Sequence, residues 1–383
     1  MSAGTRRILY VQYANPGMYP PVEHSSRILA DAGWRVVFLG IHASGSARRL
    51  LVPHHPRIRA LLMSHAAPGW RQKLHYLAYC VWVLVWSIVW RPHRVYLSDP
   101  LACPIGWLLA TLGVRVVYHE HDSPNGPPVG RFQQFVRHAR RRLSQCAYVV
   151  LPNAERLREF QRDTGGGEFA CIVWNCPALS EVGPERATKE SNRTTLFYVG
   201  VLGPTMLPLT VIDALVKCPP MNLSVVGYET IGHPHYSEQL VQRAQREGVA
   251  DRITIHRSLP RLQFYAVART CDVGLMTLPL QSEELNIRHL LGASNKSFDY
   301  LACGLALLVS DLPDWTQTFA NGRYGMTCNP SDGVSIANAM HWFHDHPDET
   351  RAMGEAGRKR VLADWNYETQ FEPVKQYLER PRS

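Results

Sequence analysis

Short apolar runs alternate with amphipathic, helix-like stretches along the whole chain. The first two runs cover residues 8–12 and 34–41, and the stretch between them, 22–32, has helical spacing of its apolar positions. This alternation of strand and helix patterns predicts parallel sheets covered by helices. The remaining strand-like runs are 95–99, 115–118, 148–153, 172–175, 196–200, 223–227, 253–255, 273–276 and 305–310.

A polar stretch divides this series into two halves. Residues 178–193 contain Gly, Pro, Thr and Ser but no apolar run, which is typical of an interdomain linker. We therefore expect an α/β protein with two Rossmann-like parallel-sheet domains, at 1–180 and 194–365. A last helix is expected within 366–383.

The segment around residues 294–304 carries the clearest chemical signal. Ser294 and Asn295 can cap a helix, Lys296 follows at its start, and Gly304 stands where a helix ends. Free N–H groups at a helix start and an adjacent lysine favour an anion. Asp299, about one turn in, can accept hydroxyl hydrogens from a ribose. The segment is thus either a nucleotide-diphosphate site or an ordinary helix–strand pair.

The same residues resemble a known family. Family 4 retaining glycosyltransferases, which have the GT-B fold, often carry Lys-x-Phe-Glu-Tyr-x-x-x-Gly, and the chain has that pattern from Lys296 to Gly304 with Asp299 in place of Glu. In many family members a second acid precedes this Glu by eight positions; here that position is Leu291, so the second acid is absent. The resemblance implies two Rossmann-like domains facing a central cleft. It also implies transfer of a sugar, with retention, from a nucleotide-diphospho-sugar to a glycan or polyprenyl-linked acceptor, without a metal or other cofactor.

One departure from the family concerns the loop after the first strand of the second half. The family usually clamps the donor diphosphate there with an Arg and a Lys, but residues 200–208 contain neither. Gly203 can still let backbone N–H groups approach phosphate, with Lys296 and Arg288 supplying positive charge. The resemblance also implies that 366–383 crosses back to the first domain.

Four polar residues follow the strand at 115–118. Two histidines, His119 and His121, alternate with Glu120 and Asp122, so each pair should share a face if the strand continues. The resemblance places a histidine near the donor sugar and acceptor, and His121 with Asp122 is the best match, with His119 as the alternative. A metal site and satisfied structural histidines are the other interpretations.

The loop at 13–21 follows the first strand and is expected to face the cleft. It is rich in proline, so it is either a turn with a purely structural role or a substrate contact. Gly17 in this loop, with Glu23 and His24 at the start of the next helix, are the candidate acceptor-side residues.

The composition of the chain limits the kinds of binding partner that are expected. The chain has 383 residues and a formal net charge of +9, which predicts attraction to nucleotide sugars or anionic membranes. Nucleic acid is not expected, because no nucleic-acid-binding motif is present. Nine cysteines without a C-x-x-C pair give no zinc pattern and indicate reduced thiols in a cytoplasmic protein. The first seven residues are too short and polar for a signal peptide.

Two predicted helices could either cover the sheet or contact a membrane. Residues 74–90 are apolar and aromatic with basic flanks, and they predict a sheet-covering helix, a helix lying partly in a membrane surface, or a spanning helix. Residues 131–142 form a basic amphipathic helix that can cover the sheet or lie on anionic lipid. The protein is therefore expected to be cytoplasmic, with peripheral attachment to the inner face of the membrane as an option.

Three functions fit these observations. The first is a glycosyltransferase of envelope polysaccharide or glycoconjugate biosynthesis. The second is a catalytically silent GT-B subunit that binds a partner, which the missing Arg/Lys pair favours. The third is an epimerase that acts on the nucleotide sugar itself.

Overall fold

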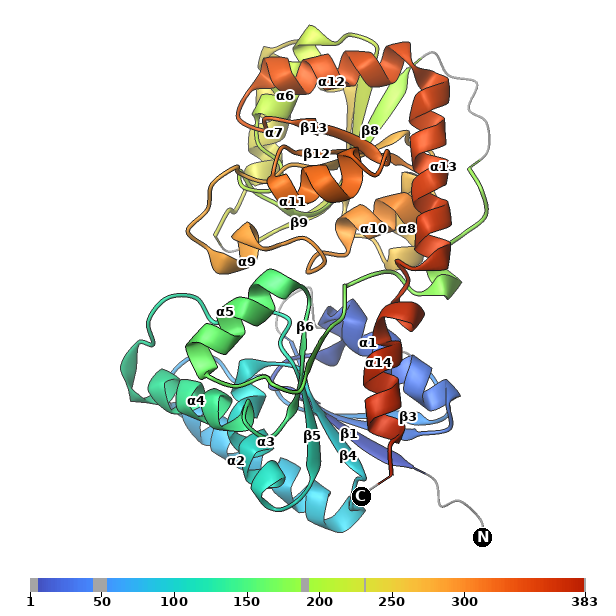
Figure 1. Ribbon diagram of the computed structural model, residues 1–383. Helices are drawn as coiled ribbons and strands as arrows, with labels where there is room; N and C mark the ends of the chain where they lie inside the picture. Colours follow the sequence, from blue (N-terminus) through green and yellow to red (C-terminus); the bar gives the residue numbers. More distant parts are fainter. Residues whose placement is uncertain (1–5, 44–53, 187–192, 231, 382–383) are drawn as a thin grey trace. The chain divides into compact units, whose positions relative to one another are not determined.

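The computed structural model describes residues 6–43, 54–186, 193–230 and 232–381 (Figure 1). The chain forms two compact units. The first unit comprises Met1–Asn175, Glu284–Ala293 and Tyr367–Ser383, and the second comprises Cys176–Glu283 and Ser294–Asn366. The domain boundaries predicted from the sequence placed all of 194–365 in the second domain. Segment Glu284–Ala293 instead belongs to the first unit. Residues 187–192 of the expected linker lie outside the described residues.

The first unit is built on a parallel sheet of seven strands in the order β3-β2-β1-β4-β5-β6-β7. The strands are β1 (Arg7–Val11), β2 (Arg35–Ile41), β3 (Ile58–Met63), β4 (Arg94–Leu97), β5 (Arg115–His119), β6 (Tyr148–Leu151) and β7 (Ala170–Ile172). Its helices are α1 (Pro20–Asp31), α2 (Trp70–Trp90), α3 (Cys103–Thr111), α4 (Gly130–Leu143), α5 (Ala154–Thr164), α9 (Leu285–Arg288) and α14 (Tyr367–Glu379).

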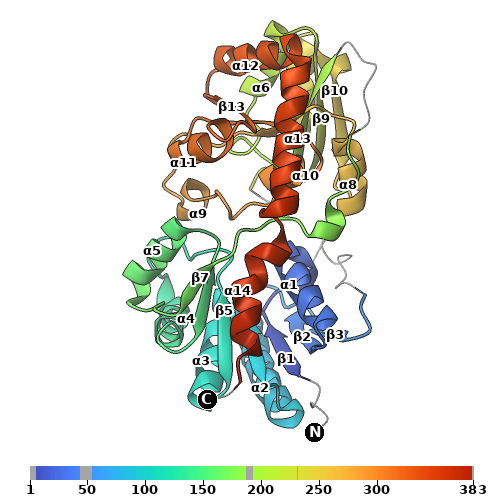
Figure 2. The same ribbon diagram turned by 45° about the vertical axis from the view of Figure 1, so that its right-hand side comes forward.

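Side chains on the two faces of this sheet contribute to two separate hydrophobic cores. Leu9 and Val11 of β1 face α2, α3 and α4, whereas Ile8 and Tyr10 face α1 and α14. Helix α14 packs beside α1 on this second face, and Figure 2 shows it alongside the strands of the unit. The last helix therefore belongs to the core of the first unit.

The second unit has a parallel sheet of six strands in the order β10-β9-β8-β11-β12-β13. The strands are β8 (Thr194–Leu202), β9 (Met221–Glu229), β10 (Ile253–Arg257), β11 (Val273–Met276), β12 (Ala306–Ser310) and β13 (Gly325–Cys328). Its helices are α6 (Thr210–Lys217), α7 (Tyr236–Arg246), α8 (Arg261–Ala268), α10 (Lys296–Ala302), α11 (Pro313–Trp315), α12 (Gly333–Asp345) and α13 (Pro347–Ala363).

The segment singled out in the sequence forms α10 and β12. Phe298, Leu301 and Ala302 are buried, and Gly304 has φ +74°, the left-handed conformation that ends many helices. Strand β12 lies between β11 and β13 and is buried along its whole length. The predicted loop–helix–turn–strand order is confirmed.

Candidate functional site

Lys296, the first residue of α10, lies against the end of β8. Its ammonium group is 5.0 Å from the centroid of the Tyr198 ring, and Nζ is 3.4 Å from the Tyr198 hydroxyl. Gly200 makes room for its stem: a Cβ at that position would stand 2.4 Å from Lys296 Cε. Gly200 also has φ +133°, which side chains rarely adopt. Glycine is therefore required here by both the backbone and the lysine.

The charge of Lys296 has no counter-ion among the residues that the structure describes. No acidic side chain of the described residues forms an ion pair with it, although the residue is partly buried. Burial lowers the pKa of its ammonium group to about 8. A poorly solvated, unpaired cation at the carboxyl end of a parallel sheet is suited to hold an anion.

Two polar side chains beside Lys296 also lack protein partners. Asn295 Nδ2 and Ser297 Oγ are buried and make no hydrogen bond within the part of the chain that is described. The expected capping role of Asn295 is wrong, because its side chain accepts no N–H of α10. Ser294 makes only a long contact, with its Oγ 3.4 Å from the Lys296 N–H. The Asn295 amide is thus available to a ligand.

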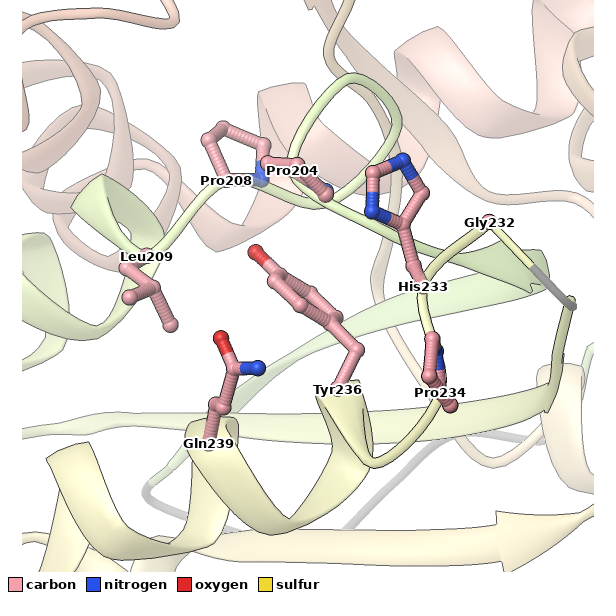
Figure 3. Close-up of a pocket in the computed structure, with 8 residues that line it drawn as sticks. All are labelled: Pro204, Pro208, Leu209, Gly232, His233, Pro234, Tyr236 and Gln239. Carbon is pink, nitrogen blue, oxygen red and sulfur yellow. The ribbon is translucent and has the colours of Figure 1, made fainter.

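The loop after β8 carries a pocket of its own. Gly203 accepts from the N–H groups of Met206 and Leu207, which folds the loop into a tight turn. A cavity of about 410 Å³ adjoins it, and Figure 3 shows His233 beside Pro204 at its rim. None of its described lining residues is Lys or Arg, so this pocket does not replace the family's basic clamp. The lining residues are Pro204, Pro208, Leu209, Gly232, His233, Pro234, Tyr236 and Gln239.

Asp299 is not the open carboxylate that the sequence indicated. Its side chain is buried, and Oδ1 accepts from Arg261 Nη2 at 2.9 Å and from the Tyr265 hydroxyl at 2.7 Å. Arg261 also pairs with Glu181 at 2.6 Å. Burial raises the pKa of the Asp299 carboxyl, and Arg261 opposes that rise. Asp299 is therefore held in this internal ion network, and its contact with a ribose stays a prediction.

In the first unit, His119 and His121 lie together at the end of β5. Their ring centroids are 3.9 Å apart, so the expectation that they share a face is confirmed. His119 Nδ1 is 2.7 Å from the Tyr96 hydroxyl, whereas both ring nitrogens of His121 are buried without a partner among the described residues. Burial lowers the pKa of His121 to about 3. His121 is therefore neutral at physiological pH and free to exchange hydrogen bonds with a ligand.

The two acids between and after these histidines have different environments. Glu120 is buried in a bidentate pair with Arg140, at 2.5 and 2.8 Å, and accepts from the Tyr118 hydroxyl. Asp122 is exposed. Glu120 is thus a core residue, and Asp122 is the acid of this group that reaches solvent.

A buried arginine that the sequence did not reveal supports His121. Arg156 of α5 donates to the carbonyl oxygen of His121 at 2.6 Å, and to the carbonyl oxygens of Asn286 and His289. It therefore fixes α9 to the first unit and sets the backbone that presents His121. Arg288 is exposed on this same segment. Its expected contact with the donor stays a prediction.

The three acceptor-side candidates are divided by the fold. Gly17 lies in a short turn, where its N–H donates to Asn15 Oδ1 at 3.0 Å. Glu23 pairs with Arg27 one turn along α1. His24 is buried, with its ring 5.2 Å from that of Tyr367 in α14. The expectation that His24 faces a substrate is therefore wrong, because it belongs to the core between α1 and α14.

The described residues contain no cluster of three His, Cys, Asp or Glu side chains that could hold a metal ion. The nine cysteines, all within the described ranges, are free thiols.

Comparison with known families matches both halves of the chain. Residues 17–170 match the family described as a glycosyl transferase 4-like domain, and residues 211–376 match the family described as glycosyl transferase-like. Together these two matches leave only the termini and the region around the linker unassigned.

One relative of known activity agrees with this result. A GDP-mannose-dependent alpha-(1-6)-phosphatidylinositol monomannoside mannosyltransferase of Mycolicibacterium smegmatis is 26% identical over 167 residues, which is 44% of this chain and 42% of that protein. The matched segment thus spans less than half of the relative.

Solved structures of similar fold cover almost the whole chain. Sucrose-phosphate synthase of Thermosynechococcus elongatus superposes with a TM-score of 0.75 at 16% identity, over 97% of this chain and 98% of that one. Anabaena HepE in complex with UDP and glucose gives 0.72 at 17% identity, over 97% and 99%. With two parallel-sheet α/β units, both family matches and this likeness in fold, the chain belongs to the group 1 glycosyltransferases of the GT-B fold.

Proposed function

We propose that the protein transfers a sugar, with retention of configuration, from a nucleotide-diphospho-sugar to a glycan or polyprenyl-linked acceptor at the cytoplasmic face of a membrane. Envelope polysaccharide or glycoconjugate biosynthesis is the proposed setting. The observation that carries this proposal is Lys296, a partly buried ammonium group without a counter-ion in the described protein. A donor diphosphate supplies the negative charge that this position lacks.

The donor-side roles follow from the groups around Lys296. As the bond between the sugar and the diphosphate breaks, negative charge grows on the leaving oxygen, and a fixed cation stabilises it. The Asn295 Nδ2 group, which has no partner within the described ranges, donates to a phosphate oxygen. Backbone N–H groups of this loop other than those of Met206 and Leu207, which already donate to Gly203, are proposed as further donors. Because Lys296 provides the charge, this mechanism needs no metal ion, and chelation by EDTA should leave the activity unchanged.

His121 is the proposed positioning group on the acceptor side. Its neutral imidazole can accept from one hydroxyl and donate to another, which orients an acceptor or donor sugar. The buried acid next to it, Glu120, is held by Arg140 and is not available as a nucleophile. We therefore favour front-face displacement by the acceptor hydroxyl over a double displacement through Glu120.

The relatives support the two substrate classes without naming them for this chain. HepE is seen with UDP and glucose, and the mycobacterial relative is named for GDP-mannose and a phosphatidylinositol mannoside. A thermal-shift screen with UDP, GDP, TDP and ADP tests donor binding directly. Stabilisation by at least one of the four is the expected result, and stabilisation by none would contradict the proposal.

His121→Ala is expected to lower kcat about 10²-fold or more, because misplaced reacting hydroxyls lose the advantage of orientation. Transfer from the radiolabelled donor chosen by the screen measures this. Nucleotide affinity should stay within about twofold of wild type, because Lys296 is untouched. His24→Ala is the matched control, since it removes a buried imidazole that packs against Tyr367. If both variants lose activity equally, His121 has no special role.

The second candidate is a catalytically silent GT-B subunit. The absence of Lys and Arg from residues 200–208 favours it. Incubation with radiolabelled nucleotide sugars separates the two candidates. Slow hydrolysis of the donor in the absence of acceptor supports the transferase, and no hydrolysis of any nucleotide sugar supports the silent subunit.

A further inference from the structure

Helix α2 covers the sheet with one side and leaves a continuous apolar row on the other. Tyr79 and Val83 on the inner side are fully buried. The outer row, hereafter the α2 outer face, has positions three or four residues apart and therefore on one side of the helix. Its members are between 49% and 66% exposed: Trp70, Leu74, Leu77, Val81, Val85 and Ile88.

This row is longer and more continuous than scattered surface hydrophobics. A helix of 21 residues is about 30 Å long, and the outer row runs from its first residue almost to its last. Helix α3 packs beside α2, and Leu108 within α3 and Leu112 directly after it are also exposed. A contiguous apolar surface of this kind marks a site of interaction.

Positive charge borders the row at both ends. Arg71 and Lys73 stand in the first turn of α2. At the other end a cavity of about 670 Å³ is lined by Ile88 of the α2 outer face and by basic residues. These basic residues are Arg6, Arg91, His93, Arg94 and Arg380, and the only acid among the described lining residues is Glu379, which pairs with Arg6.

We propose that the α2 outer face is the surface by which this protein lies on an anionic phospholipid bilayer, with a lipid phosphate in the basic cavity at the end of α2. The apolar row matches the acyl region and the arginines match the phosphates, as in other interfacial helices. Of the described helices, α2 alone is long and apolar enough to cross a membrane. Its inner side, however, is built into the core of the first unit, so it lies along the interface.

This inference deepens the membrane location given under the proposed function and rests on that location, but it is independent of the donor chemistry. The test is co-sedimentation of the full chain, without nucleotide, with vesicles of phosphatidylcholine alone or mixed with phosphatidylglycerol. Wild type should bind the mixed vesicles, and added salt should weaken the binding. Failure of wild type to bind either vesicle would overturn the inference, whereas the nucleotide thermal shift reports on the proposed function separately.

Leu77→Glu should weaken binding to the mixed vesicles about tenfold or more, because it removes an inserted side chain and adds a charge of the same sign as the lipid. Leu262→Glu is the matched control: Leu262 is 74% exposed on α8 in the second unit, and its replacement should change nothing. Both variants should keep the circular dichroism spectrum and the melting temperature of the wild type without nucleotide, which shows that they are folded. Equal vesicle binding by both would contradict the role of α2.

Arg91→Asn tests the cavity. Arg91 ends α2 with φ +49°, a conformation that Asn tolerates, so the charge is removed without backbone strain. Binding to mixed vesicles should fall about fivefold, while binding to phosphatidylcholine alone should not change. At equal ionic strength, inorganic phosphate should reduce binding to the mixed vesicles no more than the added salt does. Sedimentation of free protein as a dimer that Leu77→Glu disrupts, without vesicle binding, would assign the surface to self-association instead.

Discussion

Lys296→Met is expected to weaken binding of the donor nucleotide by about 2–4 kcal/mol, or roughly thirty- to several-hundred-fold, because it removes the cation that neutralises the diphosphate. Methionine keeps an apolar stem against Gly200, so the local packing survives. Isothermal titration with the nucleoside diphosphate selected by thermal shift measures the loss. Arg288→Ala is the control and should change the affinity by no more than about twofold, since Arg288 is exposed on the first unit.

The same variant should show two further signs of the lysine. Without ligand it should be more stable than wild type by about 1–3 kcal/mol, because a poorly solvated charge is gone. In wild type the affinity should fall by up to about tenfold per pH unit above pH 8, since the free ammonium group loses its proton there and the bound one retains it. Lys296→Met should lack this dependence. Wild-type affinity in the variant would remove the assignment.

Arg261→Met is expected to destabilise the second unit by about 3–5 kcal/mol, because it leaves the buried Asp299 carboxylate and Glu181 without their cation. Hydrogen exchange of peptides that cover α8 and α10, followed by mass spectrometry, localises and measures the loss. Arg351→Met, at a more exposed pair with Glu355, is the control and should cost less than about 1 kcal/mol.

Asp299→Asn separates the structural role from the ribose role. It should raise hydrogen exchange in α10 and change the nucleotide affinity less than Lys296→Met does. Combined with Arg261→Met it should recover part of the stability lost in the single arginine variant, because the unpaired charge is removed. A large loss of nucleotide affinity in Asp299→Asn, without any change in hydrogen exchange, would support a contact of Asp299 with the ribose instead.

Local patterns were enough to predict most of the fold. The apolar run before Ser310 and the glycine at 304 defined β12 and the end of α10, since both depend on neighbours in the sequence. Two strands were not predicted, β3 and β13, and each lies at the edge of its sheet. Edge strands are only partly buried, so their apolar pattern is weaker, as in the Gly-Met-Thr-Cys of β13.

The positions of the candidate-site residues were predictable only where they depend on local geometry. His119 and His121 were found because they follow a buried strand, and Lys296 because it begins a helix. The networks of Arg156 and Arg261 were missed. Each arginine joins partners 30 to more than 100 positions away, as in Arg156 with Asn286 and Arg261 with Asp299, and no local spacing signals such contacts.

The interpretation of α2 as a sheet-covering helix is confirmed for its inner side, where Tyr79 and Val83 are buried. The pattern alone could not decide between core and membrane surface, because a helix that serves both has apolar residues all round. Only the burial of individual side chains separates the two faces.

A crystal structure of the protein with the nucleoside diphosphate that stabilises it tests the central claim most directly. The account predicts a phosphate oxygen within hydrogen-bond distance of Lys296 Nζ, with Asn295 Nδ2 on the same diphosphate. A diphosphate bound elsewhere, with the lysine still resting on the Tyr198 ring, would contradict it.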